Sequence, residues 1–261
     1  MGRVISLINQ KGGVGKTTTA INLAAALGEA GERTLLIDFD PQGNATTGVM
    51  RDRLDADANT VYELLCGLAK PEDCIIFSVA EGVDLMPAAV SLSGAEVELL
   101  ELDSTETKTQ LRNCIAELKE QYDYILIDCP PSLGILTINA LTAADGAIIP
   151  VQCEFYALEG LRQVIETIRL IQAKLNPDLR IEGVLLTMYN SRTRLSVQVV
   201  DTVRETVVKD LHEPVFETLI PRNVRLAEAP SFGEPITVYD PASRGAESYR
   251  LLAAELINNY Q

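Results

Sequence analysis

The sequence predicts an α/β protein whose centre is a doubly wound, mostly parallel β-sheet. Short apolar runs rich in β-branched residues recur along the chain, and they are nearly continuous, as in strands buried on both faces of a parallel sheet. Amphipathic stretches of helical length separate these runs. A glycine-rich loop follows the first run and precedes the first helical stretch. In such folds, ligands bind at the carboxyl ends of the strands.

Six runs are expected to form strands, at residues 3–8, 34–38, 83–86, 124–128, 147–151 and 181–187. Helices are expected at residues 17–30, 105–121, 158–175, 197–209 and 243–258. The last helix carries Leu251, Leu252 and Leu256 at helical spacing and few basic residues. A membrane-surface helix would be rich in basic residues, so the leucines indicate core packing.

The chain has 261 residues, which fits one or two domains. No Pro-, Gly- or Ser-rich linker, internal repeat or low-complexity run divides it, so residues 1–261 are expected to form one domain. No apolar run reaches the length of about 18 residues that crosses a bilayer, and the first residues do not read as a signal peptide. We therefore expect a cytoplasmic protein with no membrane partner.

The cysteines and the histidine do not predict a metal centre. The five cysteines include no C-x-x-C pair and lie mostly in apolar surroundings, so we expect reduced packing residues rather than disulfides or zinc ligands. The single histidine, His212, is flanked by Asp210, Glu213 and Pro214 and has no second histidine to share a metal. We assign no role to it.

The net charge of −15, taken as a whole, disfavours nucleic acid as a partner, because phosphate contacts need clustered Lys and Arg. The charge is unevenly distributed. Residues 1–179 hold 26 acidic and 13 basic side chains, whereas residues 180–261 hold 11 acidic and nine basic ones, nearly all arginine. Any anion-binding face is therefore expected in the last third of the chain.

The glycine-rich loop has the residue types of a phosphate-binding site. It consists of Lys11, Gly12, Gly13, Val14, Gly15, Lys16, Thr17 and Thr18. Glycines let backbone N–H groups turn towards phosphate oxygens, and the N-terminus of the following helix adds partial positive charge. Lys16 should neutralise the β- and γ-phosphates, and the Thr17 hydroxyl should bind Mg²⁺. The sequence thus predicts a site for ATP or ADP with Mg²⁺, although Gln10 replaces the first glycine of the G-x-x-x-x-G-K-[ST] pattern.

Acidic residues end two further expected strands. The segment LLIDFDPQGN places Asp38 and Asp40 beside the end of the first strand, where one could hold Mg²⁺ through water and the other could position an attacking water. The segment YILIDCPP is apolar up to Asp128, whose carboxylate is expected to bind the water shell of the metal. One aspartate at a strand end is often only a helix cap. Here the glycine-rich loop, the segment with Asp38 and Asp40 and the segment with Asp128 follow one another in the order expected of a nucleotide site, which favours that interpretation.

The loop form K-G-G-x-G-K-T-T resembles the deviant Walker A box of the ParA/MinD family of ATPases. In that family the extra lysine, which corresponds to Lys11, reaches across a dimer interface to the partner's nucleotide. The resemblance therefore implies an ATP-dependent homodimer in which Lys11, Lys16 and Asp40 are catalytic. It makes Asp40 the residue that positions water, and it implies that Thr17, Asp38 and Asp128 serve the metal.

The resemblance extends over almost the whole chain. The segments DFDPQGN (38–44), DCPPSLG (128–134), PVQCEFYALEG (150–160) and IPRNVRLAEAP (220–230) look like those of the chromosomal ParA proteins, which are bacterial DNA-segregation ATPases. In that group, ATP-bound dimers coat nucleoid DNA without sequence preference, and a ParB-like centromere-binding partner triggers hydrolysis and release. The resemblance implies the same partners and a cytoplasmic, nucleoid-associated location.

Arginines after the late strands are the candidates for DNA binding. The resemblance implies DNA contacts at Arg192 and Arg222, and a few such backbone contacts, doubled in a dimer, would give weak and salt-sensitive binding. Surface ion pairs or nucleotide contacts are the alternative for each arginine. The family also builds its adenine pocket from the loop of Pro221, Arg222 and Asn223 and from the position of Asn190, so Arg222 could serve either ligand.

Three rival functions share this fold. MinD-like membrane-positioning ATPases end in a basic amphipathic helix, which the C-terminal segment LAAELINNYQ does not resemble. Nitrogenase-type iron proteins hold an iron–sulfur cluster by cysteines a few residues beyond Walker B, and the residues around Ile135 supply none. A ParA-like ATPase that positions a protein cargo would have the same ATPase residues. That alternative stays open beside chromosome or plasmid segregation.

Overall fold

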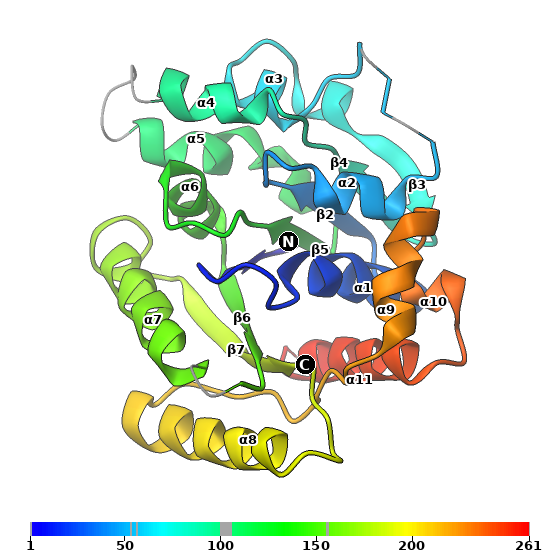
Figure 1. Ribbon diagram of the computed structural model, residues 1–261. Coiled ribbons are helices and arrows are strands. Elements are labelled where there is room, and N and C mark those ends of the chain that lie inside the picture. Colours follow the sequence, from blue (N-terminus) through cyan, green and yellow to red (C-terminus); the bar gives the residue numbers. More distant parts are fainter. Residues whose placement is uncertain (1, 53, 56, 100–105, 155–156, 261) are drawn as a thin grey trace.

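A computed structural model describes residues 2–52, 54–55, 57–99, 106–154 and 157–260. Its centre is a seven-stranded sheet in the order β3-β4-β2-β5-β1-β6-β7 (Figure 1). The strands are β1 Arg3–Leu7, β2 Thr34–Asp38, β3 Ile76–Ala80, β4 Val83–Met86, β5 Tyr124–Asp128, β6 Gly146–Gln152 and β7 Arg180–Thr187. All pairings except that of β3 are parallel. The predicted fold class and the six expected strands are confirmed.

The sequence analysis does not predict β3, which runs antiparallel to β4 at one edge of the sheet. None of its residues is fully buried, and the Phe77 side chain is 66% exposed. Ser78 has a φ of 58°, and the register with β4 shifts around it. An edge strand of this kind lacks the doubly buried environment that makes the central strands apolar throughout.

Helices cover both faces of the sheet (Figure 1). One face is packed by α1, α2, α9, α10 and α11, and the other by α3, α4, α5, α6, α7 and α8. The helices are α1 Lys16–Glu29, α2 Asn44–Val49, α3 Val61–Leu65, α4 Leu92–Leu99, α5 Glu106–Cys114, α6 Ile135–Ala143, α7 Ala157–Lys174, α8 Arg194–Thr206, α9 Val224–Glu228, α10 Ile236–Tyr239 and α11 Arg244–Asn258. Alternate strand residues enter opposite layers, so Val4 packs in one core cluster and Ile5 in the other.

The helix expected at residues 105–121 is shorter in the structure. Thr105 lies outside the described residues, α5 ends at Cys114, and a 3₁₀ turn follows at Glu117–Glu120. The Lys119 carbonyl accepts a hydrogen bond from the Gly2 N–H at 2.6 Å, and the Asp123 N–H donates to the Arg33 carbonyl at 2.8 Å. These contacts with neighbouring segments use the groups that would have continued the helix.

The C-terminal helix α11 packs on α1, as the leucine spacing predicts. Leu252 and Leu256 are fully buried, whereas Leu251 is 57% exposed, so two of the three leucines belong to the core. Arg250 forms an ion pair with Glu29 of α1 at 2.7 Å. None of the helices that the structure describes is long and apolar enough to cross a membrane.

The fold brings the candidate residues to one edge of the sheet. Strands β1, β2 and β5 end side by side, and the register pairs both Leu7 and Asp38 with Asp128. Strand β1 lies between β5 and β6, so the loop that leaves it stands at the point where the chain connections diverge. Crevices at such points bind ligands in doubly wound folds.

Candidate functional site

The loop between β1 and α1 has the open backbone that a phosphate site needs. Gly13 and Gly15 have φ values of 73° and 90°, which are left-handed conformations that side chains rarely adopt. Gly15 precedes α1, and no side chain caps the first turn of that helix. The first N–H groups of α1 are therefore available to an anion.

Two strands on one side hold the loop in place. The Asn9 side chain donates to the Pro150 carbonyl at 2.8 Å and accepts from the Lys11 N–H at 3.0 Å. The Thr187 hydroxyl, at the end of β7, donates to the Val14 carbonyl at 2.8 Å. The loop is thereby tied to β6 and β7, which favours a preformed site.

Lys16, the first residue of α1, is largely buried. The residue is 7% exposed, and its Nζ donates to the Lys11 carbonyl at 3.3 Å. Burial lowers the pKa of Lys16, and the negative charge of Asp128 opposes that effect. A cation held in this way suits a site that receives a strongly anionic ligand.

Asp128 is fully buried at the end of β5, and neither of its carboxylate oxygens has a hydrogen-bond partner among the described residues. Burial raises its pKa well above the usual range, and the charge of Asp38 adds to this effect. The nearby Thr17 hydroxyl and the Lys16 ammonium lower the pKa of Asp128, although neither forms a hydrogen bond with its carboxylate. Buried carboxylates are normally paired, so this one fits a metal ion or its bound water.

Asp38, in contrast, has its oxygens engaged by the loop that follows it. Its Oδ2 accepts from the N–H and the hydroxyl of Thr46, both at 2.7 Å, and its Oδ1 accepts from the Asp40 N–H at 3.2 Å. Burial nevertheless raises the pKa of Asp38 to about 6. The Thr46 hydroxyl also accepts from the Ala88 N–H at 2.9 Å, so this threonine links β2, α2 and the segment after β4. The sequence analysis does not single out Thr46, because nothing in its local pattern distinguishes it.

Asp40 lies two residues beyond β2 and is 7% exposed. Its Oδ1 accepts from the Gln42 N–H at 3.0 Å, and its carbonyl accepts from the Gly43 N–H at 2.9 Å. The side chain is therefore oriented by its own turn. Its charge acts on both Lys16 and Asp128, so it stands near the same centre.

Lys11 differs from Lys16 in that it points into solvent. Its Nζ forms an ion pair with Glu154 at 3.1 Å, and the two side chains are 49% and 50% exposed. Glu154 belongs to the segment at residues 150–160, which is one of those that carry the family resemblance. Phe155 and Tyr156 of this segment lie outside the described residues.

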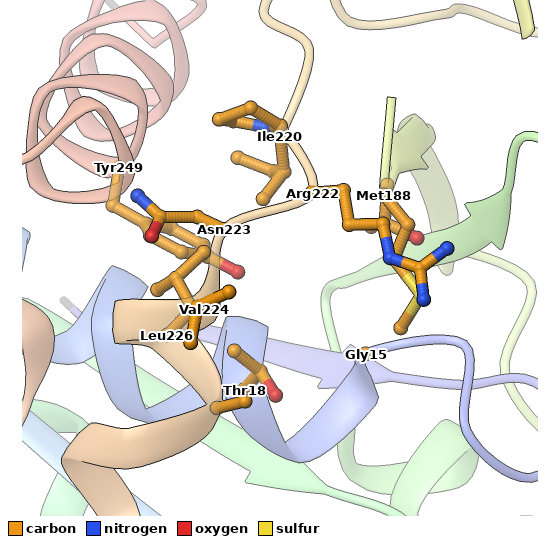
Figure 2. A pocket seen from close by; sticks show the side chains of 12 residues that line it. Gly15, Thr18, Met188, Ile220, Arg222, Asn223, Val224, Leu226 and Tyr249 are labelled. Carbon is orange, nitrogen blue, oxygen red and sulfur yellow. The ribbon is translucent and has the colours of Figure 1, made fainter. Parts of the chain in front are cut away.

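An apolar cavity of about 360 Å³ opens beside the loop (Figure 2). It is lined by Gly15, Thr18, Thr187, Met188, Ile220, Pro221, Arg222, Asn223, Val224, Leu226, Ala227 and Tyr249. The Tyr249 ring comes from α11, and its hydroxyl lies 3.3 Å from the Thr19 hydroxyl of α1. Flat aromatic ligands suit such a cavity next to a phosphate loop. The sequence analysis misses Met188 and Tyr249, which carry no motif, and it quotes Leu226 only as part of the segment at residues 220–230.

A second, larger cavity of about 1000 Å³ adjoins the first. Arg192, Arg222 and Arg244 line it, and we call this cavity the basic groove. Asn190 lines the basic groove and is not among the described residues that line the apolar cavity. Its Oδ1 accepts a hydrogen bond from the Arg192 N–H at 3.1 Å. The segment from Pro221 to Val224 lines both cavities.

Comparison with known proteins places these features in a family. A family model described as an AAA domain matches residues 2–181. The sporulation initiation inhibitor protein Soj of Bacillus subtilis is 53% identical over 259 residues, covering 99% of this chain and 100% of that protein. The chromosome partitioning protein ParA of Myxococcus xanthus is 52% identical over 257 residues, covering 98% of this chain and 88% of that protein.

A solved structure gives the same likeness in three dimensions. A cobyrinic acid a,c-diamide synthase from Mycobacterium smegmatis, solved with bound ADP and magnesium, has a TM-score of 0.85 and 39% sequence identity. The match covers 100% of this chain and 96% of that one. The same protein has also been solved with an ATP analogue and magnesium.

Proposed function

The chain belongs to the Soj/ParA family of chromosome-partitioning ATPases, and from this premise we propose that its ATP-bound form is a homodimer that binds double-stranded DNA without sequence preference. The chain is a P-loop ATP hydrolase. One arrangement supports the proposal above all: the segment from Pro221 to Val224 lines both a cavity beside the phosphate loop and a groove that contains three arginines. A nucleotide and a polyanion would then contact the same short segment.

We assign the binding of Mg-ATP to the loop and the strand ends around it. Lys16 and the N–H groups of residues 11–18 hold the β- and γ-phosphates. Thr17 ligates the metal, and Asp128 orients its water shell, while Asp38 acts at longer range because Thr46 already occupies its oxygens. Bound Mg²⁺ supplies positive charge that offsets charge developing on the phosphoryl oxygens.

The apolar cavity is the proposed site of adenine. Pro221 and Asn223 line it together with Met188, Leu226 and Tyr249. Asn190, which the family resemblance also implies, would reach the nucleotide only from the side of the basic groove. Arg222 lines both cavities, so we assign it to DNA while keeping contact with the nucleotide as the alternative outcome.

For hydrolysis, we assign Asp40 to the positioning of the attacking water. Phosphoryl transfer needs little covalent help, so orientation and charge account for most of the catalysis. Lys11 is the residue proposed to act on the partner's nucleotide, and its exposure leaves it free to do so once it separates from Glu154. Loss of that contact after hydrolysis would release the dimer.

The remaining partners follow from the family. We propose that residues 1–261 act as one ATPase domain, located on the nucleoid, and that a ParB-like centromere-binding protein stimulates its hydrolysis. A protein cargo positioned over DNA is the alternative to chromosome or plasmid segregation. DNA binding is common to both, so the first experiment addresses it.

The test is sedimentation of the protein with non-specific DNA, with and without Mg-ATP, at two salt concentrations. We expect binding that requires ATP and weakens steeply with salt, because arginine–phosphate contacts release counterions. The Lys16→Ala variant serves as the control that cannot use ATP. Equal binding with and without ATP, or none in either condition, would contradict the proposal. Stimulation of hydrolysis by a ParB-like protein would then separate segregation from cargo positioning.

A further inference from the structure

The basic groove receives one arginine from each of three different elements. Arg192 precedes α8, Arg222 precedes α9, and Arg244 is the first residue of α11. All three are exposed and line the same cavity. Arg192 and Arg222 are implied by the family resemblance, whereas nothing in the sequence analysis points to Arg244.

These arginines are free of ion pairs, unlike others close to them in sequence. Arg225 pairs with Glu228 at 3.0 Å and with Asp240 at 3.6 Å, and Arg250 pairs with Glu29 at 2.7 Å. Within the described part of the chain, no acidic side chain lies within ion-pair distance of Arg192, Arg222 or Arg244. Three arginines that line one groove and have no ion-pair partner among the described residues are available to an anion, although Arg222 also lines the apolar cavity.

Backbone contacts fix the first two arginines relative to each other. The Arg222 N–H donates to the Tyr189 carbonyl at 2.9 Å, and the Tyr189 N–H donates to the Ile220 carbonyl at 3.0 Å. The loop of Arg192 follows directly after Tyr189, and the Asn190 side chain shapes it. Arg192 and Arg222 therefore stand on adjoining, hydrogen-bonded segments.

The start of α11 packs closely against the segment that carries Arg222. A Cβ on Gly245 would lie 2.9 Å from the Leu226 side chain and 3.3 Å from Asn223 Nδ2, so only glycine allows this approach. The Ser243 hydroxyl caps α11 by accepting from the Ala246 N–H at 3.1 Å. The backbone that carries Arg244 is thus held in a fixed position beside the segment that carries Arg222.

We propose that Arg244 is a third contact to DNA phosphates, on the side of the basic groove formed by α11. This inference rests on the proposed DNA-binding function and adds a residue to it. The ligand chemistry is that of a polyanion with regularly spaced phosphates, because three separated guanidinium groups exceed what a single small anion can engage. A homodimer would present six such contacts.

Glu247 offers an independent check, since it lies one turn after Arg244 and is an acidic residue that lines the groove. Its carboxylate would repel DNA phosphates that approach Arg244. Removal of its charge should therefore strengthen binding, which is the opposite of the effect expected for the arginine.

The experiment compares DNA affinity in the presence of Mg-ATP over a series of salt concentrations for the wild type, Arg244→Ala, Arg244→Lys, Glu247→Gln, Arg222→Ala and Arg180→Ala. Arg180 is the first residue of β7, at the end of that strand opposite to the one that leads into the groove. It is an exposed arginine that also lacks an ion pair among the described residues, so it is the matched control. ATP hydrolysis without DNA and ATP-dependent dimerisation are measured for each variant.

We expect Arg244→Ala to weaken DNA binding about tenfold and to reduce the slope of log affinity against log salt by about 2, since each dimer loses two phosphate contacts. Arg244→Lys should recover part of the loss, because lysine contacts phosphate as a point charge. Glu247→Gln should bind DNA more tightly than the wild type, and Arg180→Ala should match it.

Three results would overturn the inference, and they are distinguishable. If Arg222→Ala loses affinity while Arg244→Ala behaves like Arg180→Ala, the role of Arg244 is wrong and the proposed function stands. If the wild type shows no ATP-dependent DNA binding, both fail. A loss of dimerisation in Arg244→Ala would also overturn the inference, because the arginine would then act at the subunit interface.

Discussion

Replacement of Asp128 by asparagine should stabilise the nucleotide-free protein and abolish its response to Mg-ATP. Asp128 is a fully buried carboxylate whose two oxygens have no hydrogen-bond partner among the described residues. Asparagine has nearly the same shape but no charge. A residue that binds a ligand but destabilises the ligand-free protein should behave in this way, because its replacement raises stability and lowers activity.

The expected increase in the free energy of unfolding is the difference between two costs of burial. An uncompensated buried charge costs about 3–5 kcal/mol, and a buried amide without partners costs about 1–3 kcal/mol. The nearby Lys16 ammonium reduces the first term. We therefore expect Asp128→Asn to raise the free energy of unfolding by about 1–3 kcal/mol at pH 8.

The gain should depend on pH with a definite sign. Burial raises the pKa of Asp128 above its unfolded value, so the folded protein keeps this proton longer than the unfolded chain as pH rises. The wild type therefore loses stability between the unfolded and the folded pKa, and the variant does not. The difference between the two proteins should be near zero only below the unfolded pKa, where Asp128 is protonated in both states. It should already be present at about pH 5, be larger at about pH 8 and level off above the folded pKa.

Urea denaturation of both proteins at about pH 5 and about pH 8, with and without Mg-ATP, tests these points. At about 100 times its dissociation constant, Mg-ATP should stabilise the wild type by about 2.7 kcal/mol and the variant much less. A variant that is less stable than the wild type at pH 8, or one that gains equally from Mg-ATP, would refute the role of Asp128 at the metal.

Four further substitutions test the proposed ATPase cycle. Lys16→Ala should weaken ATP binding at least about tenfold in calorimetry, because a buried charge-assisted contact is lost, and wild-type affinity would show that the phosphate site is misassigned. Lys11→Ala should bind ATP normally but form no ATP-dependent dimer in light scattering. Glu154→Gln should dimerise up to about fivefold more readily, since it frees Lys11 from an exposed ion pair, and an unchanged dimer in both variants would contradict the role of that lysine. Asp40→Ala should reduce phosphate release about a hundredfold or more while keeping an ATP-bound dimer in size-exclusion chromatography, and turnover at the wild-type rate would exclude it as the residue that positions water.

Much of the fold could be predicted because the central strands are buried on both faces. Runs such as residues 34–38 and 124–128 are largely apolar up to the aspartate that ends each of them, and the structure buries every residue in them. Strand β3 was not predicted although residues 74–80 are apolar apart from Ser78. It lies antiparallel at the edge, with Phe77 exposed and an irregular backbone at Ser78, so it falls outside the rhythm of buried parallel strands separated by helices on which the prediction relied.

The phosphate loop could be predicted from spacing because a single segment supplies nearly all of it. The cavity beside it could not. The Tyr249 hydroxyl meets Thr19 from a position 230 residues later in the chain, and Thr46 meets Asp38 only because α2 folds back onto β2. Such contacts depend on packing between elements, and neither tyrosine nor threonine at these positions carries a local signal.

The segment from Pro221 to Val224, which lines both cavities, would couple the proposed binding of nucleotide to that of DNA. If a nucleotide shifts the segment from Pro221 to Val224 and thereby changes the affinity for DNA by some factor, DNA must change the affinity for that nucleotide by the same factor. If ATP strengthens DNA binding in this way, a dimer on DNA would bind its ATP more tightly than a dimer free in solution. The ATP dependence of DNA affinity and the DNA dependence of ATP affinity would then be two measurements of one free energy.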